Sequence, residues 1–308
     1  MDDPTEDPTE DPTDPSLKGF RSGYVALVGA PNVGKSTLMN RLLEERLAIV
    51  TPKPQTTRRR TLGILNGPGH QIILLDTPGL MEPRYDLHRA MLNEAKSAID
   101  DADLLLCLVE PGALLEPPAM VAESSKPRFL AINKVDTVRP KEALLPVLTH
   151  YAATGLFDEL FPISARDGTG VREMFDAMLL RLPEAPPFYP VDQLADQSER
   201  FFVGELIRER ILERYREEVP YACEVDIVEF TERPGAKDYI EANVVVESPS
   251  QKAILIGAGA EAIRALGEEA RVVVEEFLGR AVYLSLRVKV MPKWRKRAGA
   301  LRRFGYRS

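Results

Sequence analysis

The apolar residues of positions 19–185 fall into short runs, separated by stretches in which they recur at helical spacing. Short apolar runs predict buried strands, and helical spacing predicts amphipathic helices. We expect strands at 24–29, 61–66, 71–76, 103–109, 128–133 and 160–163, and helices at 35–45, 87–101, 140–153 and 171–182. This alternation indicates an α/β domain with a mostly parallel sheet and helices on both faces. Such sheets bind ligands at the C-terminal ends of their strands.

The pattern changes in the second half of the chain. A charged helical stretch at 198–218 precedes two strand patterns, 223–230 and 239–247, which are joined by a turn with Pro234-Gly235. Two helices follow at 250–256 and 261–278, the second stopped by Gly279, and a strand at 281–291 closes the set. The order α-β-β-α-α-β predicts a separate α+β domain.

Composition and charge divide the chain further. Residues 1–17 repeat Asp-Pro-Thr, which opposes a packed element and predicts a disordered acidic tail. The prolines at 183, 186, 187 and 190 predict a rigid linker. We therefore expect a tail at 1–17, a first domain at 18–185, a linker at 186–197, a second domain at 198–292 and a basic tail at 293–308.

The net charge of −7 comes from the acidic tail alone. Seven of the 47 acidic residues lie in the first fifteen positions, which leaves 40 acidic against 40 basic residues. Cys107 and Cys223 are single and lie in apolar runs, so we expect buried thiols and a reducing cytoplasm. No apolar run approaches the roughly 20 residues of a membrane helix, and the acidic start does not predict a secretory signal.

A glycine-rich loop follows the first strand and precedes the first helix: Gly29-Ala30-Pro31-Asn32-Val33-Gly34-Lys35-Ser36. In this context backbone N–H groups and the helix start can surround a phosphate. Lys35 would reach the outer phosphates, the Ser36 hydroxyl would bind Mg²⁺, and Thr37 would complete the nucleotide contacts. The alternative is a glycine turn that only opens a structural helix.

A second motif, Asp76-Thr77-Pro78-Gly79, directly follows the strand at 71–76. Asp76 can hold the Mg²⁺ shell, usually through water, and the Gly79 N–H can face a terminal phosphate. The same four residues are also a common turn composition.

Two further motifs suit a guanine base. Asn133-Lys134-Val135-Asp136 ends the fifth strand, and Ser164-Ala165 follows the sixth. Asp136 can accept hydrogen bonds from guanine N1–H and the 2-amino group, Lys134 can lie over the base, and the Ala165 N–H can meet the guanine carbonyl. Each motif is weak alone, but four in order at strand ends predict a guanine-nucleotide domain.

The basic stretch 51–60 lies between the first two motifs and lacks an apolar face. It predicts a mobile loop that covers the nucleotide, with Thr57 as a second Mg²⁺ ligand and Thr56 as its near rival. A solvated connector is the alternative.

These motifs, together with Gln55-Thr56-Thr57-Arg58, are similar to those of translation-factor-class GTPases. With Phe188–Gln193 and the second half, residues 20–308 resemble the Era family of bacterial ribosome-assembly GTPases, in the TrmE-Era-EngA-YihA-Septin-like class. The resemblance implies GTP hydrolysis with Mg²⁺, with Lys35, Thr57 and Gly79 acting in catalysis. Leu80 replaces the water-orienting glutamine of signalling GTPases, which implies slow turnover, and Asn32 implies sensitivity to K⁺.

The resemblance also implies that the second domain is a type II KH domain. Its partners would be the 3′ end of small-subunit ribosomal RNA and the small ribosomal subunit, and no DNA. The implied protein is a cytoplasmic monomer that can associate weakly with the inner face of the cell membrane.

A KH domain clamps single-stranded RNA with a Gly-x-x-Gly loop. The family pattern Gly-Lys-Gly-Gly is replaced here by Gly257-Ala258-Gly259-Ala260, so RNA binding through the loop is weakened or lost, and a KH-like domain that binds protein is the competing interpretation. The basic tail, with its interleaved Trp294, Phe304 and Tyr306, would compensate by phosphate contact and base stacking. The remaining RNA-binding candidates are Lys252, Lys289, Lys293 and Arg295.

Two rival hypotheses concern the first domain. Its nucleotide site could be purely structural, in which case the chain would bind without hydrolysis. The same phosphate-binding loop could also serve a metabolic phosphotransferase, which would need a lid over an acceptor substrate, and the sequence shows no such lid.

Overall fold

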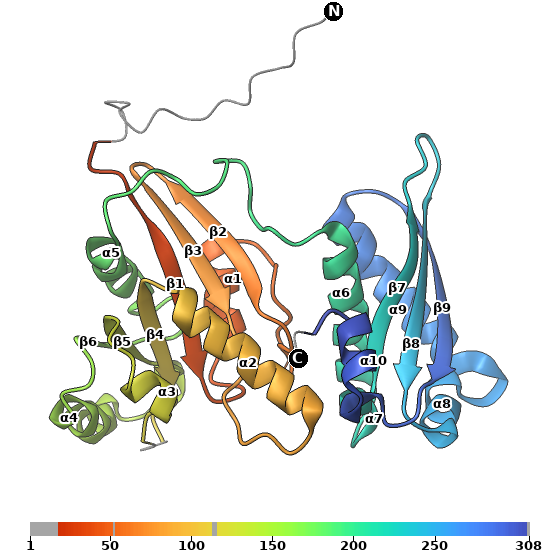
Figure 1. The fold of residues 1–308 in the computed structure, drawn as a ribbon, viewed down its shortest axis with the longest axis horizontal. Coiled ribbons are helices and arrows are strands. Elements are labelled where there is room, and N and C mark those ends of the chain that lie inside the picture. Colours follow the sequence, from red (N-terminus) through yellow and green to blue (C-terminus); the bar gives the residue numbers. More distant parts are fainter. Residues whose placement is uncertain (1–17, 52, 113–115, 307–308) are drawn as a thin grey trace, which may run out of the picture.

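The first domain is built on one six-stranded sheet (Figure 1). The computed structural model describes residues 18–51, 53–112 and 116–306, so the acidic repeat lies outside the described residues. The strand order is β2-β3-β1-β4-β5-β6, and only the β2–β3 pair is antiparallel. The strands are β1 (Arg21–Gly29), β2 (Thr61–Gly67), β3 (His70–Asp76), β4 (Leu104–Val109), β5 (Arg128–Ile132) and β6 (Glu159–Pro162).

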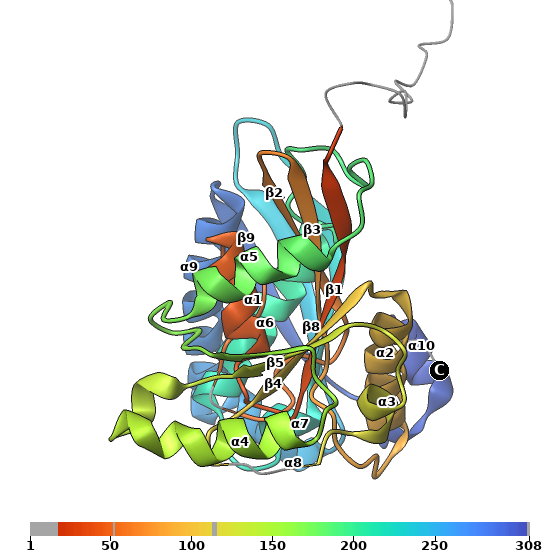
Figure 2. The same ribbon diagram turned by 90° about the vertical axis from the view of Figure 1, so that its left-hand side faces the viewer.

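Helices cover both faces of this sheet. Two pack against one face, α1 (Lys35–Leu43) and α5 (Val171–Arg181). The other face is covered by α2 (Asp86–Asp101), α3 (Ala119–Ala122) and α4 (Leu145–Ala153). Figure 2 shows α1 and α5 on the side of the sheet opposite α2. The strands are buried on both faces because they are apolar at almost every position, as expected for a parallel sheet.

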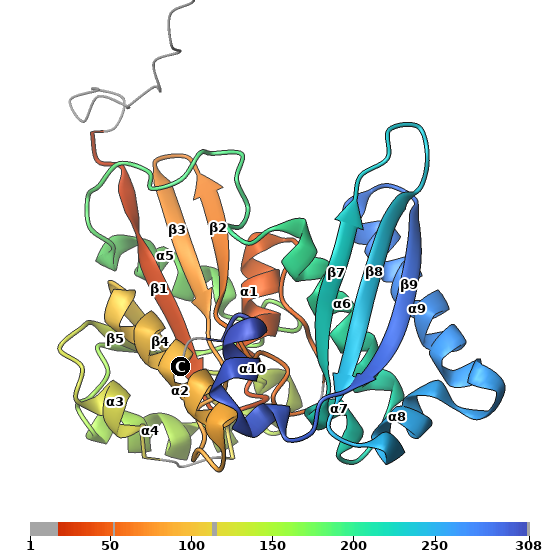
Figure 3. The same cartoon turned by 45° about the vertical axis from the view of Figure 1, so that its right-hand side comes forward.

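The second domain is a three-stranded sheet, β7-β8-β9, with helices on one face. Its strands are β7 (Glu224–Thr231), β8 (Asp238–Val246) and β9 (Val282–Val290), and its helices are α6 (Glu199–Arg214), α7 (Val219–Ala222), α8 (Pro249–Ile256) and α9 (Glu261–Leu278). Alternate residues of β8, such as Ile240, Ala242 and Val244, enter the core with α6 and α9. In Figure 3 these two helices lie behind the sheet, and no helix covers the upper part of its near face.

The segment after β9 is the main departure from the sequence-based expectation. The charge pattern predicts a basic tail for RNA, but the segment forms η5 (Trp294–Lys296) and α10 (Ala298–Arg303) and packs between the domains. Trp294, Leu301, Phe304 and Tyr306 form one buried cluster with Leu87 and Met91 of α2 and with Val245 of β8. The free energy gained by burying these large apolar side chains outweighs the cost of bringing a highly charged segment against the protein.

The remaining differences are small. The predicted helix at 198–218 ends at Arg214, where Tyr215 is extended, and the helix at 140–153 begins with the 3₁₀ turn Lys141–Leu144. The chain between the domains follows the edge strand β2, where Ile64 N donates to Leu194 O at 2.8 Å. No helix within the described residues is long and apolar enough to span a bilayer.

Candidate nucleotide site and domain interface

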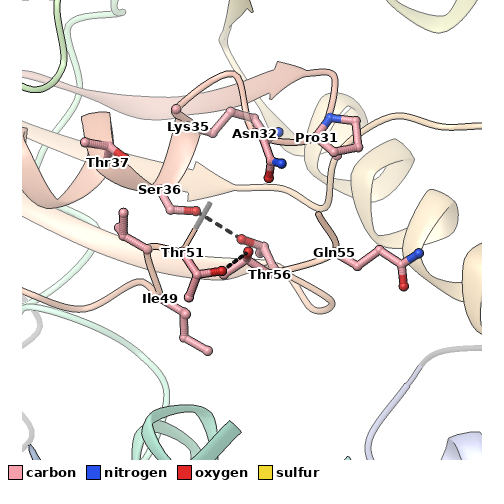
Figure 4. Close-up of a pocket in the computed structure, with 13 residues that line it drawn as sticks. Pro31, Asn32, Lys35, Ser36, Thr37, Ile49, Thr51, Gln55 and Thr56 are labelled. Atoms are coloured by element: carbon pink, nitrogen blue, oxygen red, sulfur yellow. Dashed lines mark hydrogen bonds between the residues drawn. The ribbon is translucent and has the colours of Figure 1, made fainter. Parts of the chain in front are cut away.

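The phosphate-binding loop lies between β1 and α1, as predicted, and its backbone is in unusual conformations. Asn32 and Gly34 both have positive φ, 65° and 100°, which turns successive N–H groups toward one side. A Cβ on Gly34 would collide with the side chain of Asn133, so only glycine fits there. Figure 4 shows the hollow that this loop forms with the segment 49–57.

Lys35 is held beneath the loop. Its Nζ donates to the carbonyl oxygens of Gly29 at 3.2 Å and Ala30 at 3.0 Å, and only 6% of the residue is exposed. Burial lowers the pKa of Lys35 to about 8, although the neighbouring Asp76 raises it. A buried ammonium with only carbonyl partners is under-compensated, and a phosphate would supply the missing charge.

Three side-chain oxygens meet at the ends of β3 and α1. Asp76 Oδ2 accepts from Ser36 Oγ at 2.6 Å and from Thr57 Oγ1 at 3.1 Å, and the two hydroxyls are 3.0 Å apart. Asp76 Oδ1 is buried and has no hydrogen-bond partner among the described residues. Burial raises the pKa of Asp76, against the opposing influence of Lys35. Carboxylate and hydroxyl oxygens are the ligands that Mg²⁺ prefers, so the cluster fits this ion.

The geometry distinguishes between Thr56 and Thr57, the two candidates for the second hydroxyl ligand of Mg²⁺. Thr56 Oγ1 donates to Lys53 O at 2.7 Å and contacts Thr51 Oγ1 at 3.1 Å, so it points away from Ser36. Thr57 is the residue that reaches the cluster.

The loop after β3 is packed directly on the phosphate-binding loop. A Cβ on Gly79 would lie 2.6 Å from Pro31 N, and Leu80 N donates to Gly29 O at 3.0 Å. The Leu80 side chain packs against the apolar core on the α2 side of the sheet. Thr77 is also turned inward, because its hydroxyl donates to Leu27 O at 2.6 Å. This hydrogen bond anchors the start of the loop after β3 to β1.

The guanine motifs come together at the next strand ends. Asn133 Nδ2 donates to Val33 O at 2.7 Å, and Lys134 Nζ donates to Asn32 O at 2.7 Å, so both brace the phosphate-binding loop. Asp136 Oδ1 accepts from Ser164 Oγ at 2.9 Å, which fixes the carboxylate that would read the base.

The Ala165 N–H, predicted to meet the guanine carbonyl, lies beside the asparagine of the preceding motif. It donates to Asn133 Oδ1 at 2.9 Å. A buried N–H needs a partner, and the asparagine supplies one within the protein.

The basic loop 51–60 packs against the second domain instead of standing free. Arg58 is 1% exposed and donates to the carbonyl oxygens that follow α6, including Cys223 O at 2.7 Å, and to Glu224 Oε2 at 3.1 Å. Lys53 donates to Leu212 O in the last turn of α6 and to Tyr215 O just beyond it, and Arg208 of α6 donates to Thr56 O. Sequence reasoning missed these contacts. The run of three arginines at 58–60 was the available signal.

The same loop also contacts α2. Gln55 Nε2 lies 3.1 Å from His88 Nε2, and His88 Nδ1 accepts from Arg84 N at 3.3 Å. Gln55 Oε1 is buried without a partner among the described residues, so the amide fits better turned over, with Oε1 accepting from His88 Nε2–H. Loop 51–60 is then tied to α2 and to the second domain at once.

The loop between α8 and α9 has positive φ at three of its four residues, including Ala260. Gly257, Gly259 and Ala260 have φ of 71°, 55° and 62°, and Arg264 of α9 donates to Gly259 O. Lys289 and Lys293 are exposed, and Lys252 is partly exposed.

The aromatic part of the predicted RNA surface is not confirmed by this geometry. Trp294 is 0% exposed and its Nε1 donates to Ala222 O at 2.8 Å, and Phe304 and Tyr306 are buried as well. Arg295 is paired with Glu247 and lies over the ring of Tyr85. The three aromatic rings pack against α2 and Arg295 contacts Tyr85, so these four residues join the two domains.

The fold and the site together define a nucleotide-binding domain of the phosphate-binding-loop GTPase class, joined to a KH-type domain. Residues 24–134 match the family model described as a 50S ribosome-binding GTPase, and residues 218–295 match the model described as a KH domain.

Relatives extend the likeness over almost the whole chain. GTPase Era of Heliobacterium modesticaldum is 40% identical over 295 residues, which are 94% of this chain and 98% of that protein. A structure of an Aquifex aeolicus Era variant bound to GDP and AlF4⁻ has a TM-score of 0.90 at 37% identity, and covers 94% of this chain and 100% of its own. A structure of Era with MgGDPNP and nucleotides 1506–1542 of 16S ribosomal RNA also has a TM-score of 0.90, at 36% identity and with the same coverage of both chains. The chain belongs to the Era family of GTPases.

Proposed function

We propose that this chain hydrolyses GTP to GDP and phosphate and that its nucleotide state controls how the second domain binds RNA. The observation that carries the proposal is the meeting of Ser36, Thr57 and Asp76 beside the buried Lys35. Three oxygens with an unsatisfied carboxylate and an under-compensated ammonium suit a magnesium-bound triphosphate.

Each group has a role in that reaction. Mg²⁺, when bound, neutralises charge on the outer phosphates. Ser36 and Thr57 would hold the ion, and Asp76 would hold it through water. Lys35 and the N–H groups of 29–36 would offset phosphate charge, and the Gly79 N–H would contact the terminal phosphate. Asp136, oriented by Ser164, selects guanine.

The base-selecting role of Asp136 gives a direct test. The amide N–H of an asparagine at this position would face the 2-amino group of guanine, which is also a donor. The same N–H could donate to the 2-carbonyl oxygen of xanthine. Asp136→Asn should lower kcat/KM for GTP by about 100-fold or more and raise it for the xanthosine triphosphate. Asp176→Asn, which alters an exposed carboxylate on α5 that pairs with Arg172, is the matched control and should leave both values unchanged. A protein that prefers ATP would overturn the proposal.

We also infer slow intrinsic turnover that K⁺ increases. Leu80 packs into the core, so the residue after Gly79 cannot orient water. The Asn32 amide points into the hollow beside Lys35, where an oxygen ligand could hold a monovalent cation near the phosphates (Figure 4). Exchange of Na⁺ for K⁺ at constant ionic strength should raise kcat. Equal rates in the two salts would contradict this inference.

The proposed RNA is the 3′ end of small-subunit ribosomal RNA, bound during assembly of the small subunit. Support comes from the related structure that contains 16S ribosomal RNA and from the positive-φ shape of loop 257–260 here. A groove between α9 and β9 begins beside this loop and carries Arg264 and Arg271, which suit phosphate contacts. Loop 51–60 supplies the switch, because it joins the Mg²⁺ cluster to α6.

The family likeness supports a proposal on compartment and oligomeric state. We propose a cytoplasmic monomer with weak peripheral association at the inner face of the cell membrane. Both free cysteines are buried, which suits a reducing compartment.

A further inference from the structure

The open face of the second domain's sheet carries a stack of planar groups at its edge. Tyr239 of β8 and Tyr283 of β9 are directly paired across the sheet, and their rings are 5.7 Å apart and 10° from parallel. The guanidinium of Arg233 lies 5.0 Å from the Tyr239 ring centre. Figure 3 shows β9 at the edge of the sheet. Within the described residues no strand therefore covers the outer side of Tyr283, which is 58% exposed.

Tyr283 also lies at the rim of the groove between α9 and β9. Positive charge lines this groove, since Lys237, Arg264 and Arg271 outnumber its one acid, Glu268. Arg264 donates to the loop carbonyl oxygen of Gly259, so one end of the groove lies beside loop 257–260. The groove runs along α9 from Ile263, near the loop, to Arg271, a distance of about 12 Å. Tyr283 lies at the end of the groove away from the loop. A polyanion held by the loop and following the groove would arrive at the tyrosine.

The acid nearest the stack is already neutralised. Glu241 pairs with Arg287 at 3.0 Å and accepts a hydrogen bond from Tyr239 Oη at 3.2 Å. These contacts restrict the side chain of Tyr239, and the Tyr239 ring stacks on one side of the Tyr283 ring. A base that stacks on the other side of Tyr283 would therefore contact a ring that is already ordered. Pre-ordered planar groups bind bases at a low cost in conformational entropy.

We propose that Tyr283 is a stacking site for an unpaired base of single-stranded RNA that leaves the loop 257–260 along the α9–β9 groove. This inference rests on the proposed RNA-binding function and extends it beyond the loop. It also supplies the aromatic contact that the sequence located in Trp294, Phe304 and Tyr306, which the fold buries.

The test uses the full chain with a GTP analogue and a fluorescein-labelled single-stranded RNA copied from the 3′ end of small-subunit ribosomal RNA. Tyr283→Ala should weaken binding about tenfold, and Tyr283→Phe should bind like the unaltered protein. Phe188→Ala is the matched control, because Phe188 is 50% exposed and packs on a tyrosine, Tyr24, in the other domain. It should leave RNA affinity unchanged, and all three variants should keep the GTPase rate.

A second measurement locates the contact. 2-Aminopurine is placed at successive RNA positions, and its fluorescence should be quenched at one position in the unaltered protein and recover in Tyr283→Ala. Gly259→Asp, which adds a negative charge to the loop in open space, should abolish binding of the whole RNA.

The outcomes separate the two proposals. Binding that is lost in Gly259→Asp but equal in Tyr283→Ala and the unaltered protein, with no tyrosine-dependent quenching, overturns the stacking site and leaves the RNA function standing. Absence of RNA binding by the unaltered protein overturns both.

Discussion

At the scale of single residues, Arg58 joins the nucleotide domain to the second domain. Its guanidinium is buried against Glu224, whose carboxylate also accepts from Tyr306 Oη at 2.7 Å. Burial opposes the charge of Arg58, but Tyr306 and Glu224 outweigh burial and raise its pKa. A buried pair of this kind gives little net stability over an apolar pair, but removing one partner leaves the other charge uncompensated.

Arg58→Met should therefore lower the free energy of unfolding of the second domain by about 3–5 kcal/mol. Glu224 would remain buried without its cation. Urea unfolding followed by the fluorescence of Trp294, the single tryptophan of the chain, reports this domain directly.

The control lies two residues away in the same arginine run. Arg60 pairs with Asp101, whose side chain is 51% exposed, so Arg60→Met should cost about 1 kcal/mol or less because solvent screens the pair. Equal effects of the two substitutions would contradict the role given to Arg58.

At the scale of elements, α9 begins at a strained position. Ala260 precedes the helix with φ of 62° and ψ of 24°, a left-handed conformation that L-residues other than glycine avoid. Ala260 therefore carries backbone strain that a glycine at this position would not have.

Ala260→Gly should raise the free energy of unfolding by about 1 kcal/mol, since glycine adopts positive φ without the steric penalty. Ala258→Gly is the matched control. Ala258 does not have positive φ, so glycine there should be neutral or destabilising. Chemical denaturation of both variants measures the difference, and a destabilising Ala260→Gly would show that the loop is not strained.

The elements also show how far sequence reasoning reaches. Strands and helices of both domains lie close to their predicted bounds, because each is set by local periodicity and by glycine or proline at its ends. The convergence of the candidate nucleotide residues could be predicted equally well. Gly29–Ser36, Asp76 and Asn133 each lie at the end of a strand and therefore meet at one edge of the sheet.

What the sequence did not reveal depends on contacts between distant segments. The high positive charge of residues 293–308 led us to predict a solvent-exposed tail, although its apolar side chains pack α10 against α2. A single tyrosine in a strand gives no signal, and Tyr283 becomes informative only once the register pairs it with Tyr239. The contacts of loop 51–60 are of the same kind, because their partners are mostly backbone carbonyls more than 150 residues away.

At the scale of the whole molecule, adjacent residues in loop 51–60 face different domains. Thr57 contacts Ser36 and Asp76 at the proposed Mg²⁺ site, and Arg58 enters the second domain beside Glu224. In the switch that we propose, a movement of Thr57 on loss of the terminal phosphate would displace Arg58. This displacement would couple the nucleotide site to the second domain, as a two-state switch requires.

The affinity of the full chain for the 3′-end ribosomal RNA oligonucleotide, compared between a Mg²⁺-bound GTP analogue and GDP, tests this coupling most directly. We predict tighter binding with the GTP analogue and loss of that difference in Arg58→Met. Equal affinity in the two nucleotide states of the unaltered protein would contradict the account.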